Sequence, residues 1–337
     1  MARMEEESAH RGEAMTGAGD NTARLPVGVL IPTRDAMQFL RQHLDAMQPW
    51  LASVDEIVVV DGYSKDGTIG FLRERLHHPR VRFFLHPPGL YASWNFGLRQ
   101  LRTEFAYVST IGDTITADGL RRLLATATKF TSDAVISPPR FVSPDGKPAD
   151  DRWPIHDWIE SERITAAAEL PGVRAFLLSA VNAPRGILGS SAGNLYRTAT
   201  MRARPFPTEF GHAGDTAWAL ANALESRLAV CPEAMSTFLA HAAQHSRPSG
   251  DGPQLRDRLL ALAVEKAARF ASPAVVQWLA DFQNAICAAA DADRRYRALR
   301  RPMLPWFLRA STRAGRAEKQ ARRAALREIA AQARHIQ

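Results

Sequence analysis

Short apolar runs alternate with stretches of helical periodicity along the first half of the chain, and this alternation constrains the fold more than any other feature. The apolar runs are continuous and end at turn residues or proline, as in strands that are buried on both faces. They cover residues 25–33, 56–62, 81–86, 105–113 and 133–142. Helical periodicity covers residues 36–48, 67–77, 91–102 and 116–130. The pattern predicts an α/β fold, with a parallel sheet covered by helices on both faces.

The regular alternation stops after residue 143. Residues 151–180 look mostly helical, a Gly/Ser-rich loop at 185–197 leads into a short strand, 212–227 predict a helix and 228–241 one or two strands. From residue 252 onward the sequence is rich in Ala, Leu and Arg and is predicted to be helical. We therefore divide the chain into a disordered leader (1–24), a main domain (25–250) and a basic helical C-terminal extension (251–337).

Composition excludes several classes of protein. The chain has 337 residues, 46% of them hydrophobic, and its apolar runs are too short to span a membrane. Its two cysteines, Cys231 and Cys287, form no C-x-x-C pair, so we expect two buried thiols and no cysteine-based zinc site. The polar, partly acidic N-terminal segment does not resemble a secretory signal. We expect a cytoplasmic protein.

The net charge of +8 is concentrated near the C-terminus. Residues 294–337 contain 13 Lys and Arg and only two acidic residues, together with an apolar cluster around Trp306. Such a segment is typical of peripheral binding to a membrane surface, here the inner face. The equal alternative is a helix packed on the main domain or on another subunit. We expect no nucleic-acid partner, because no recognised binding module accompanies the charge.

Polar residues follow four of the predicted strands. They are Pro32 and Thr33, then Asp61, then Tyr91 and Asn95, and finally Asp113. Because the carboxyl ends of parallel strands meet at one edge of a sheet, we expect these residues to converge there. A strand-end aspartate can accept hydrogen bonds from a ribose or a base, and helix N-termini can hold a diphosphate. The alternative for the segment after Asp61 is a helix-start turn with Asp66 as N-cap.

Five segments between residues 27 and 246 follow one another in an order and spacing that a known family shares. VGVLIPTRD is similar to that family's opening strand, and EIVVVDGYSKDGT is similar to its E-I-x-V-V-D-G-x-S-x-D-G-T segment. GLYASWNFGLRQLRTEFAYVS, SSAGNLYRTATM and HAAQHS resemble its later segments. The family is that of the inverting family 2 glycosyltransferases. The resemblance implies a GT-A-like, Rossmann-type, mixed and mainly parallel sheet, with a nucleotide-sugar half (25–142) and an acceptor half (143–250).

The resemblance also implies an activity. A sugar would move with inversion from a nucleotide-sugar donor, expected to be a UDP-sugar, to a hydroxyl of a glycan, lipid-linked or protein acceptor. The reaction would belong to polysaccharide or glycoconjugate biosynthesis. The resemblance places Pro32, Thr33 and Asp61 at the base and ribose, and Tyr91 and Asn95 near the sugar diphosphate.

The family's D-x-D motif is degenerate in this chain. Thr110-Ile111-Gly112 stands at the expected place, and Asp113 is the only acidic residue there. In the family this motif binds a divalent cation that offsets the charge of the diphosphate. The resemblance therefore implies Mg²⁺ or Mn²⁺ held by Asp113 and by His241, and a capping histidine is the alternative for His241.

A general base near the acceptor is the remaining requirement of an inverting transfer. The resemblance places it at Asp215, with glycine in place of the family's first acid, and His212 is a second candidate because its pKa lies near neutrality. The alternative for Asp215 is the N-cap of helix 215–227.

Two other functions compete with the transferase. The degenerate D-x-D favours a non-catalytic sugar-nucleotide-binding or scaffold protein, whereas the retained Asp61, Asn95, Asp215 and His241 favour the enzyme. A nicotinamide-dependent enzyme is disfavoured because no G-x-G-x-x-G follows the first strand.

Overall fold

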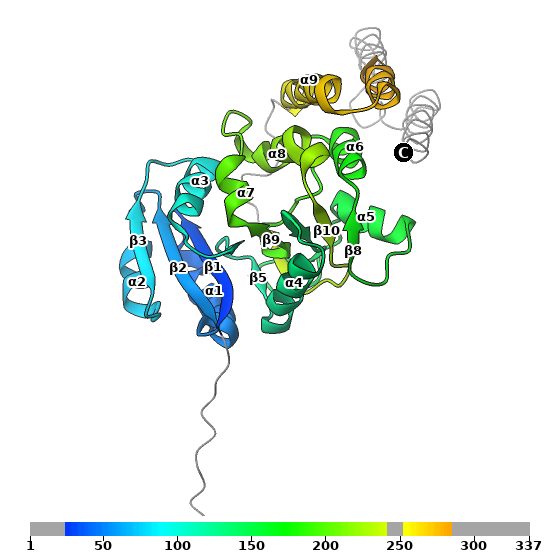
Figure 1. The fold of residues 1–337 in the computed structure, drawn as a ribbon. Coiled ribbons are helices and arrows are strands. Elements are labelled where there is room, and N and C mark those ends of the chain that lie inside the picture. The colour runs from blue at the N-terminus through cyan, green and yellow to red at the C-terminus, as the bar shows by residue number, and fades with distance from the viewer. Residues whose placement is uncertain (1–23, 241–251, 285–337) are drawn as a thin grey trace, which may run out of the picture.

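An eight-stranded sheet forms the centre of the computed structural model, which describes residues 24–240 and 252–284 (Figure 1). In spatial order its strands are β3 (Val81–Leu85), β2 (Val54–Asp61), β1 (Leu25–Thr33), β4 (Phe105–Val108), β9 (Asn194–Arg197), β6 (Ala134–Ile136), β10 (Leu228–Val230) and β8 (Ala168–Leu170). Strands β1 to β4 are parallel, and β6 is parallel to β10. Strand β9 is antiparallel to both β4 and β6, and β8 is antiparallel to β10. The expected mixed, mainly parallel sheet is confirmed.

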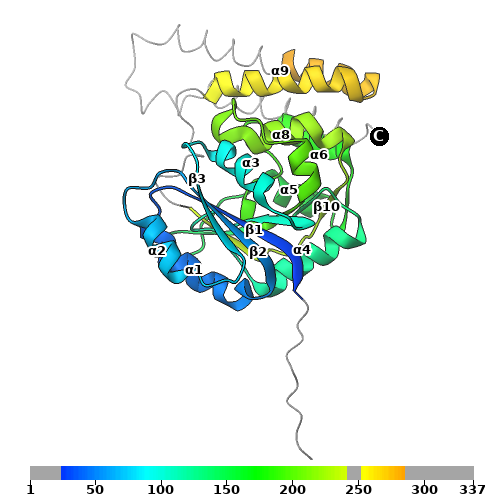
Figure 2. The same ribbon diagram turned by 60° about the vertical axis from the view of Figure 1, so that its left-hand side comes forward.

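Helices cover both faces of the sheet because successive residues of the buried strands point to opposite sides. In β1, Leu30 packs on one side, and Val29 and Ile31 pack on the other. The second side is covered by α1 (Met37–Leu51), α2 (Thr68–Arg75) and α4 (Ala117–Lys129). The first side is covered by α3 (Leu90–Gln100), α5 (Pro154–Ser161), α6 (Gly172–Asn182), α7 (Thr198–Ala203) and α8 (Gly214–Asn222). Figure 2 shows these two layers edge-on.

A second, three-stranded sheet consists of β5 (Thr114–Ile115), β11 (Ser236–Leu239) and β7 (Pro139–Val142). It corrects two expectations. The strand expected over 133–142 is divided between the two sheets, because Pro138 has no N–H to continue a ladder and Ser137 N–H donates to Gly193 O at 2.8 Å. The strand expected over 105–113 ends at Val108, so Asp113 lies in a loop before β5.

The C-terminal helices share the core of the main domain. Helix α9 (Gly252–Phe270) contacts α6 and α8, and a further helical segment covers residues 273–284. Leu259, Ala263, Trp278 and Phe282 are buried in the same cluster as α8. The basic segment 294–337, Cys287 and the leader lie outside the described residues. Within the described ranges, no helix is long and apolar enough to cross a membrane.

Candidate active site

The loops that follow β1 and β2 are tied together at the carboxyl edge of the sheet. Thr33 and Asp61 pair in register, and Gly62 N–H donates to Thr33 O at 2.8 Å. The Asp61 carboxylate accepts hydrogen bonds from Ser64 N–H (2.9 Å) and from the Ser64 hydroxyl (2.5 Å), and it is only 1% exposed. The hydroxyl oxygen of Thr33, beside Pro32, is buried without a hydrogen-bond partner in the described structure. The Asp61 carboxylate thus holds the loop in shape, and the Thr33 hydroxyl can still form a hydrogen bond with a ligand.

Two residues of these loops have left-handed backbones. Asp35 has φ of 46° and Tyr63 has φ of 58°, which is costly for a bulky side chain and is typical of functional loops. The conformation is held by Asp35 N–H, which donates to the Ser64 hydroxyl, and by Lys65 N–H, which donates to the Asp35 carboxylate, both at 2.8 Å. The two loops therefore act as one unit that presents the Tyr63 ring to solvent.

Asp66 also joins the two loops. Its carboxylate accepts hydrogen bonds from Met37 N–H and Thr68 N–H, both at 3.0 Å. Helix α2 has Gly67 as its N-cap, with φ of 91°, so the alternative that made Asp66 the N-cap is wrong by one residue. A structural role for Asp66 follows from these contacts.

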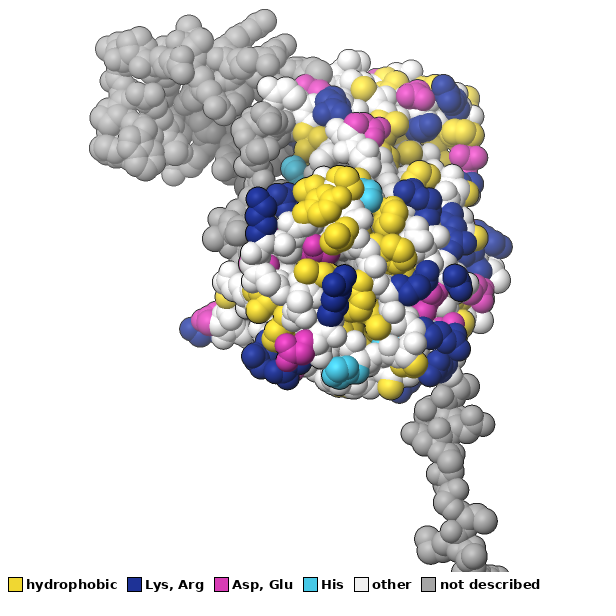
Figure 3. Space-filling model, turned by 90° about the vertical axis from the view of Figure 1, so that its left-hand side faces the viewer, with side chains coloured by type: hydrophobic (Ala, Val, Ile, Leu, Met, Phe, Trp, Pro, Cys, Tyr) yellow, Lys and Arg dark blue, Asp and Glu magenta, His cyan; other side chains and the backbone are white. Residues whose placement is uncertain are grey.

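Exposed apolar side chains lie near the carboxyl ends of β2 and β3. Tyr63 is 51% exposed, Leu85 is 55% and Leu90 is 40%. Figure 3 shows the side of the molecule that carries β3, where hydrophobic side chains lie among arginine and lysine side chains. This edge of the sheet therefore exposes one aromatic ring, that of Tyr63, and two leucine side chains.

Helix α3 begins at this edge and carries Tyr91 and Asn95. The Asn95 amide donates to Phe206 O at 2.8 Å and accepts from Phe206 N–H at 2.9 Å. Both ends of the amide therefore hold the main chain that follows α7. Its role near the donor diphosphate stays a prediction, and the contacts assign it a positioning role.

Asp113 lies below the surface in the loop after β4. It is 6% exposed, it accepts a hydrogen bond from Leu239 N–H at 3.0 Å, and Ser190 also donates to it. Burial raises the pKa of Asp113 to about 7, although these two hydrogen bonds oppose the rise. Nearby, the hydroxyls of Thr110 and Ser191 are 2.7 Å apart. Asp113 therefore ties the two sheets together.

These residues do not fit a divalent cation. Such a cation needs several oxygen ligands, and the carboxylate of Asp113 already serves Leu239 and Ser190. Within the described ranges, no group of three His, Cys, Asp or Glu side chains could hold a metal ion. The second expected ligand, His241, lies outside the described residues.

Asp215 lies in the first turn of α8 and is partly buried. Its carboxylate accepts a hydrogen bond from Thr216 N–H at 2.6 Å, and the Tyr91 hydroxyl lies close enough to favour its ionised form. Burial raises the pKa of Asp215 to about 6, because desolvation of the carboxylate outweighs these bonds. Ala213 is the N-cap of α8, so the alternative of Asp215 as N-cap is wrong. A carboxylate with this pKa is ionised at neutral pH and can accept a proton.

His212 belongs to the 3₁₀ turn η2 (Gly211–Ala213) directly before α8, and it is partly buried. Its carbonyl oxygen lies 3.4 Å from the Tyr91 hydroxyl. The structure thus brings Tyr91, His212 and Asp215 together. The link from Tyr91 to Asp215 was not predicted, since the two residues are far apart in sequence. The one feature of the sequence that could have indicated this link is the glycine in front of Asp215, which leaves room for another side chain.

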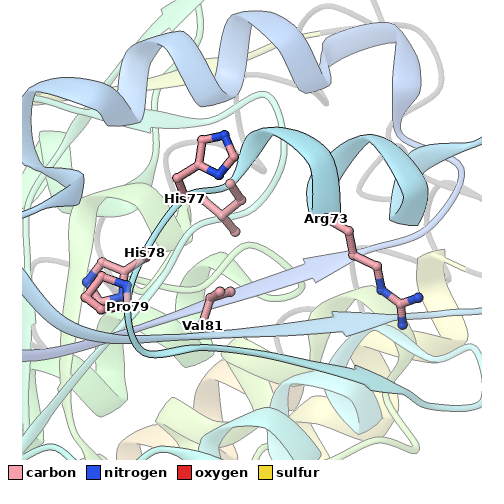
Figure 4. A pocket seen from close by; sticks show the side chains of 6 residues that line it. Arg73, His77, His78, Pro79 and Val81 are labelled. Carbon is pink, nitrogen blue, oxygen red and sulfur yellow. The ribbon is translucent and has the colours of Figure 1, made fainter.

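A shallow depression lies at the opposite end of β3. Its lining includes Arg73, His77, His78 and Val81, from the turn that joins α2 to β3 (Figure 4). Val81 begins β3, whereas Leu85 at the far end of the strand pairs with Asp61. The depression is therefore separate from the residues described above.

Comparisons with known proteins find a family match for part of the chain and solved structures with a similar fold. Residues 28–176 match the family described as glycosyl transferase family 2. Among solved structures, S. aureus TarS residues 1–349 in complex with UDP-GlcNAc are similar, with a TM-score of 0.57, 18% identity and coverage of 74% of this chain and 70% of that 1–349 chain. The corresponding UDP complex has a TM-score of 0.53, 17% identity and coverage of 74% and 69%. No curated protein matches at the sequence level.

Proposed function

We propose that this chain moves a sugar from a UDP-sugar to an acceptor hydroxyl with inversion, because its residues 28–176 match glycosyl transferase family 2. The fold supports a nucleotide-sugar donor, because solved TarS structures with the same fold contain UDP or UDP-GlcNAc. The observation that carries the proposal is Asp215, a partly buried carboxylate with a raised pKa near a helix start. The non-catalytic alternative gives no reason for such a group.

Asp215 is the general base in this proposal, and His212 is the second candidate. The acceptor hydroxyl gives its proton to the Asp215 carboxylate while its oxygen attacks the anomeric carbon of the sugar. The bond from that carbon to the diphosphate oxygen breaks, and its electron pair leaves with UDP. A base with a pKa of about 6 suits this step, because it is ionised at pH 7 and is a stronger base than a carboxylate with an ordinary pKa.

Thr33 and Asp61 serve the donor in this proposal. The free hydroxyl oxygen of Thr33 offers a hydrogen bond to the nucleoside, and Asp61 maintains the loop through Ser64. Pro32 precedes Thr33 in β1 and fixes the end of that strand. Mg²⁺ or Mn²⁺ at Asp113 and His241 would offset the diphosphate charge when bound. The described residues do not fit such a site, so no step is derived through it.

The acceptor is proposed to be a glycan, a lipid-linked molecule or a protein. Contact of the basic segment 294–337 with an anionic membrane surface would favour a lipid-linked acceptor. Sedimentation of the full chain with vesicles of phosphatidylglycerol tests this contact. Binding that is lost in high salt supports it, and no binding in low salt contradicts it.

The test of the proposed function is UDP release from a panel of UDP-GlcNAc, UDP-glucose and UDP-galactose. We expect wild type to release UDP from at least one of them, and Asp215→Asn to be slower by about 10²-fold, the usual scale for a general base. Asp118→Asn is the matched control, because Asp118 also lies in the first turn of a helix but is exposed. Equal rates for wild type and Asp215→Asn would refute the base.

A further inference from the structure

Gly214 leaves room for the ring of Tyr91 directly before Asp215. A Cβ atom at residue 214 would lie 2.4 Å from Tyr91 Cδ2 and 2.6 Å from the carbonyl oxygen of Pro207. Real Cβ atoms do not approach other atoms so closely, and the main-chain carbonyl cannot swing away as a flexible side chain could. The aromatic ring therefore occupies the space that a side chain at residue 214 would need.

The Tyr91 ring is fixed from its other sides as well. Phe206 stacks on it at 5.2 Å between ring centroids, and Trp94 meets it edge-on at 5.1 Å. Asn95 in turn holds the main chain of Phe206 through two hydrogen bonds. Tyr91 is only 5% exposed. The packing of the ring therefore fixes the position of the Tyr91 hydroxyl, at the start of α8.

The hydroxyl has two acceptors at that place. It donates to the His212 carbonyl oxygen at 3.4 Å, and the Asp215 carboxylate is close enough for the Tyr91 hydroxyl to affect its pKa. An ionised carboxylate is the stronger acceptor, so we expect the hydrogen to turn to Asp215 when that group is ionised. Once Asp215 has received a proton, the hydroxyl can turn to His212 O and keep its hydrogen bonded. Tyr91 itself neither gains nor loses a proton.

We propose that Tyr91 is a positioning residue that orients the Asp215 carboxylate and stabilises its ionised form for the attack. This inference rests on the proposed function, in which Asp215 is the base. Two further groups near Asp215 are Thr216, which donates its N–H, and Tyr196, whose hydroxyl accepts from the Asn194 amide at 3.0 Å. Neither takes the place of the Tyr91 hydroxyl.

The test is the pH dependence of UDP release by Tyr91→Phe, with the UDP-sugar that the panel identifies. Phenylalanine keeps the ring that fills the space above Gly214 and removes only the hydroxyl, so the variant is expected to fold. Loss of a hydrogen bond to a charged group corresponds to about one pKa unit. The apparent pKa that describes the fall of kcat at low pH should rise by that amount. The loss of kcat is then about threefold at pH 6.5 and vanishes near pH 9.

The control removes a different buried hydroxyl. Tyr107 is fully buried, and within the described structure its hydroxyl has no hydrogen-bond partner, so Tyr107→Phe should leave the pH profile unchanged. The positioning role is overturned if Tyr91→Phe loses the same fraction of kcat at every pH. It is also overturned if kcat of Tyr91→Phe falls at low pH with the wild-type pKa. If Asp215 is not the base, Asp215→Asn keeps the wild-type turnover and the wild-type fall of kcat at low pH. The two failures are therefore distinguishable.

Discussion

Replacing Asp215 by asparagine should make the protein more stable at neutral pH while it removes activity. The pKa of this carboxyl rises from 3.8 to about 6 in the folded chain. A group with a raised carboxyl pKa binds its proton more tightly when folded, so its ionisation opposes folding above the folded pKa. The difference corresponds to about 3 kcal/mol at pH 8, at roughly 1.4 kcal/mol per pKa unit. Asparagine carries no charge and can still accept from Thr216 N–H and Tyr91.

The assay is thermal unfolding of wild type and Asp215→Asn at pH 4.5 and pH 8. At pH 8 the variant should melt higher, by roughly 5–10 °C for a domain of this size. At pH 4.5 the difference should shrink, because the wild-type carboxyl is then mostly protonated. Asp113 also has a raised pKa, of about 7, but it is common to both proteins and cancels in the comparison. A lower melting temperature of Asp215→Asn at pH 8 would refute the reasoning and make Asp215 a structural anchor.

Three further predictions follow from single contacts. The Asp113 carboxylate is engaged by Leu239 and Ser190, so Asp113→Asn should not change how much more tightly UDP binds in Mn²⁺ than in EDTA, as measured by calorimetry. A smaller difference between Mn²⁺ and EDTA in the variant would place a cation on Asp113. Gly214→Ala should destabilise the fold by about 1–3 kcal/mol in urea unfolding, because its Cβ meets the Tyr91 ring and a main-chain carbonyl, and an unchanged midpoint would contradict this clash. Asp61→Ala should speed amide exchange at Ser64 and weaken UDP binding, whereas a weakened affinity with unchanged exchange would make Asp61 a ligand contact alone.

The sequence predicted the first half of the fold because its strands are buried on both faces. Continuous apolar runs such as β1 and β2 are distinctive, and the ends of these elements lie within a few residues of the expected ones. The second half was harder to predict because β8, β10 and β6 have only three residues each, too few to show a period. Strand β8 lies within 151–180, a range that was expected to be mostly helical. Its pairing with β10 is a tertiary contact that no local pattern reveals.

The sequence proposed the residues of the candidate site, whose roles stay predictions, but it gave none of their contacts. The strand-end pattern identified Thr33, Asp61 and Asp113, since parallel strands bring their carboxyl ends to one edge. It could not indicate that Asp113 is turned toward Leu239 or that Asn95 holds Phe206, because these partners are more than 100 residues away. The structure also explains the glycine before Asp215 as a steric requirement of Tyr91, which sequence alone left as an unexplained departure from the family.

The most direct measurement is proton NMR of the first sugar product that the full chain forms from an α-linked UDP-sugar of the panel. The account predicts that UDP and the β-configured product appear together, and that Asp215→Asn forms both about 10²-fold more slowly. An α-configured first product would contradict direct displacement. Donor binding without release of UDP in wild type would contradict the transferase itself and favour a sugar-nucleotide-binding protein.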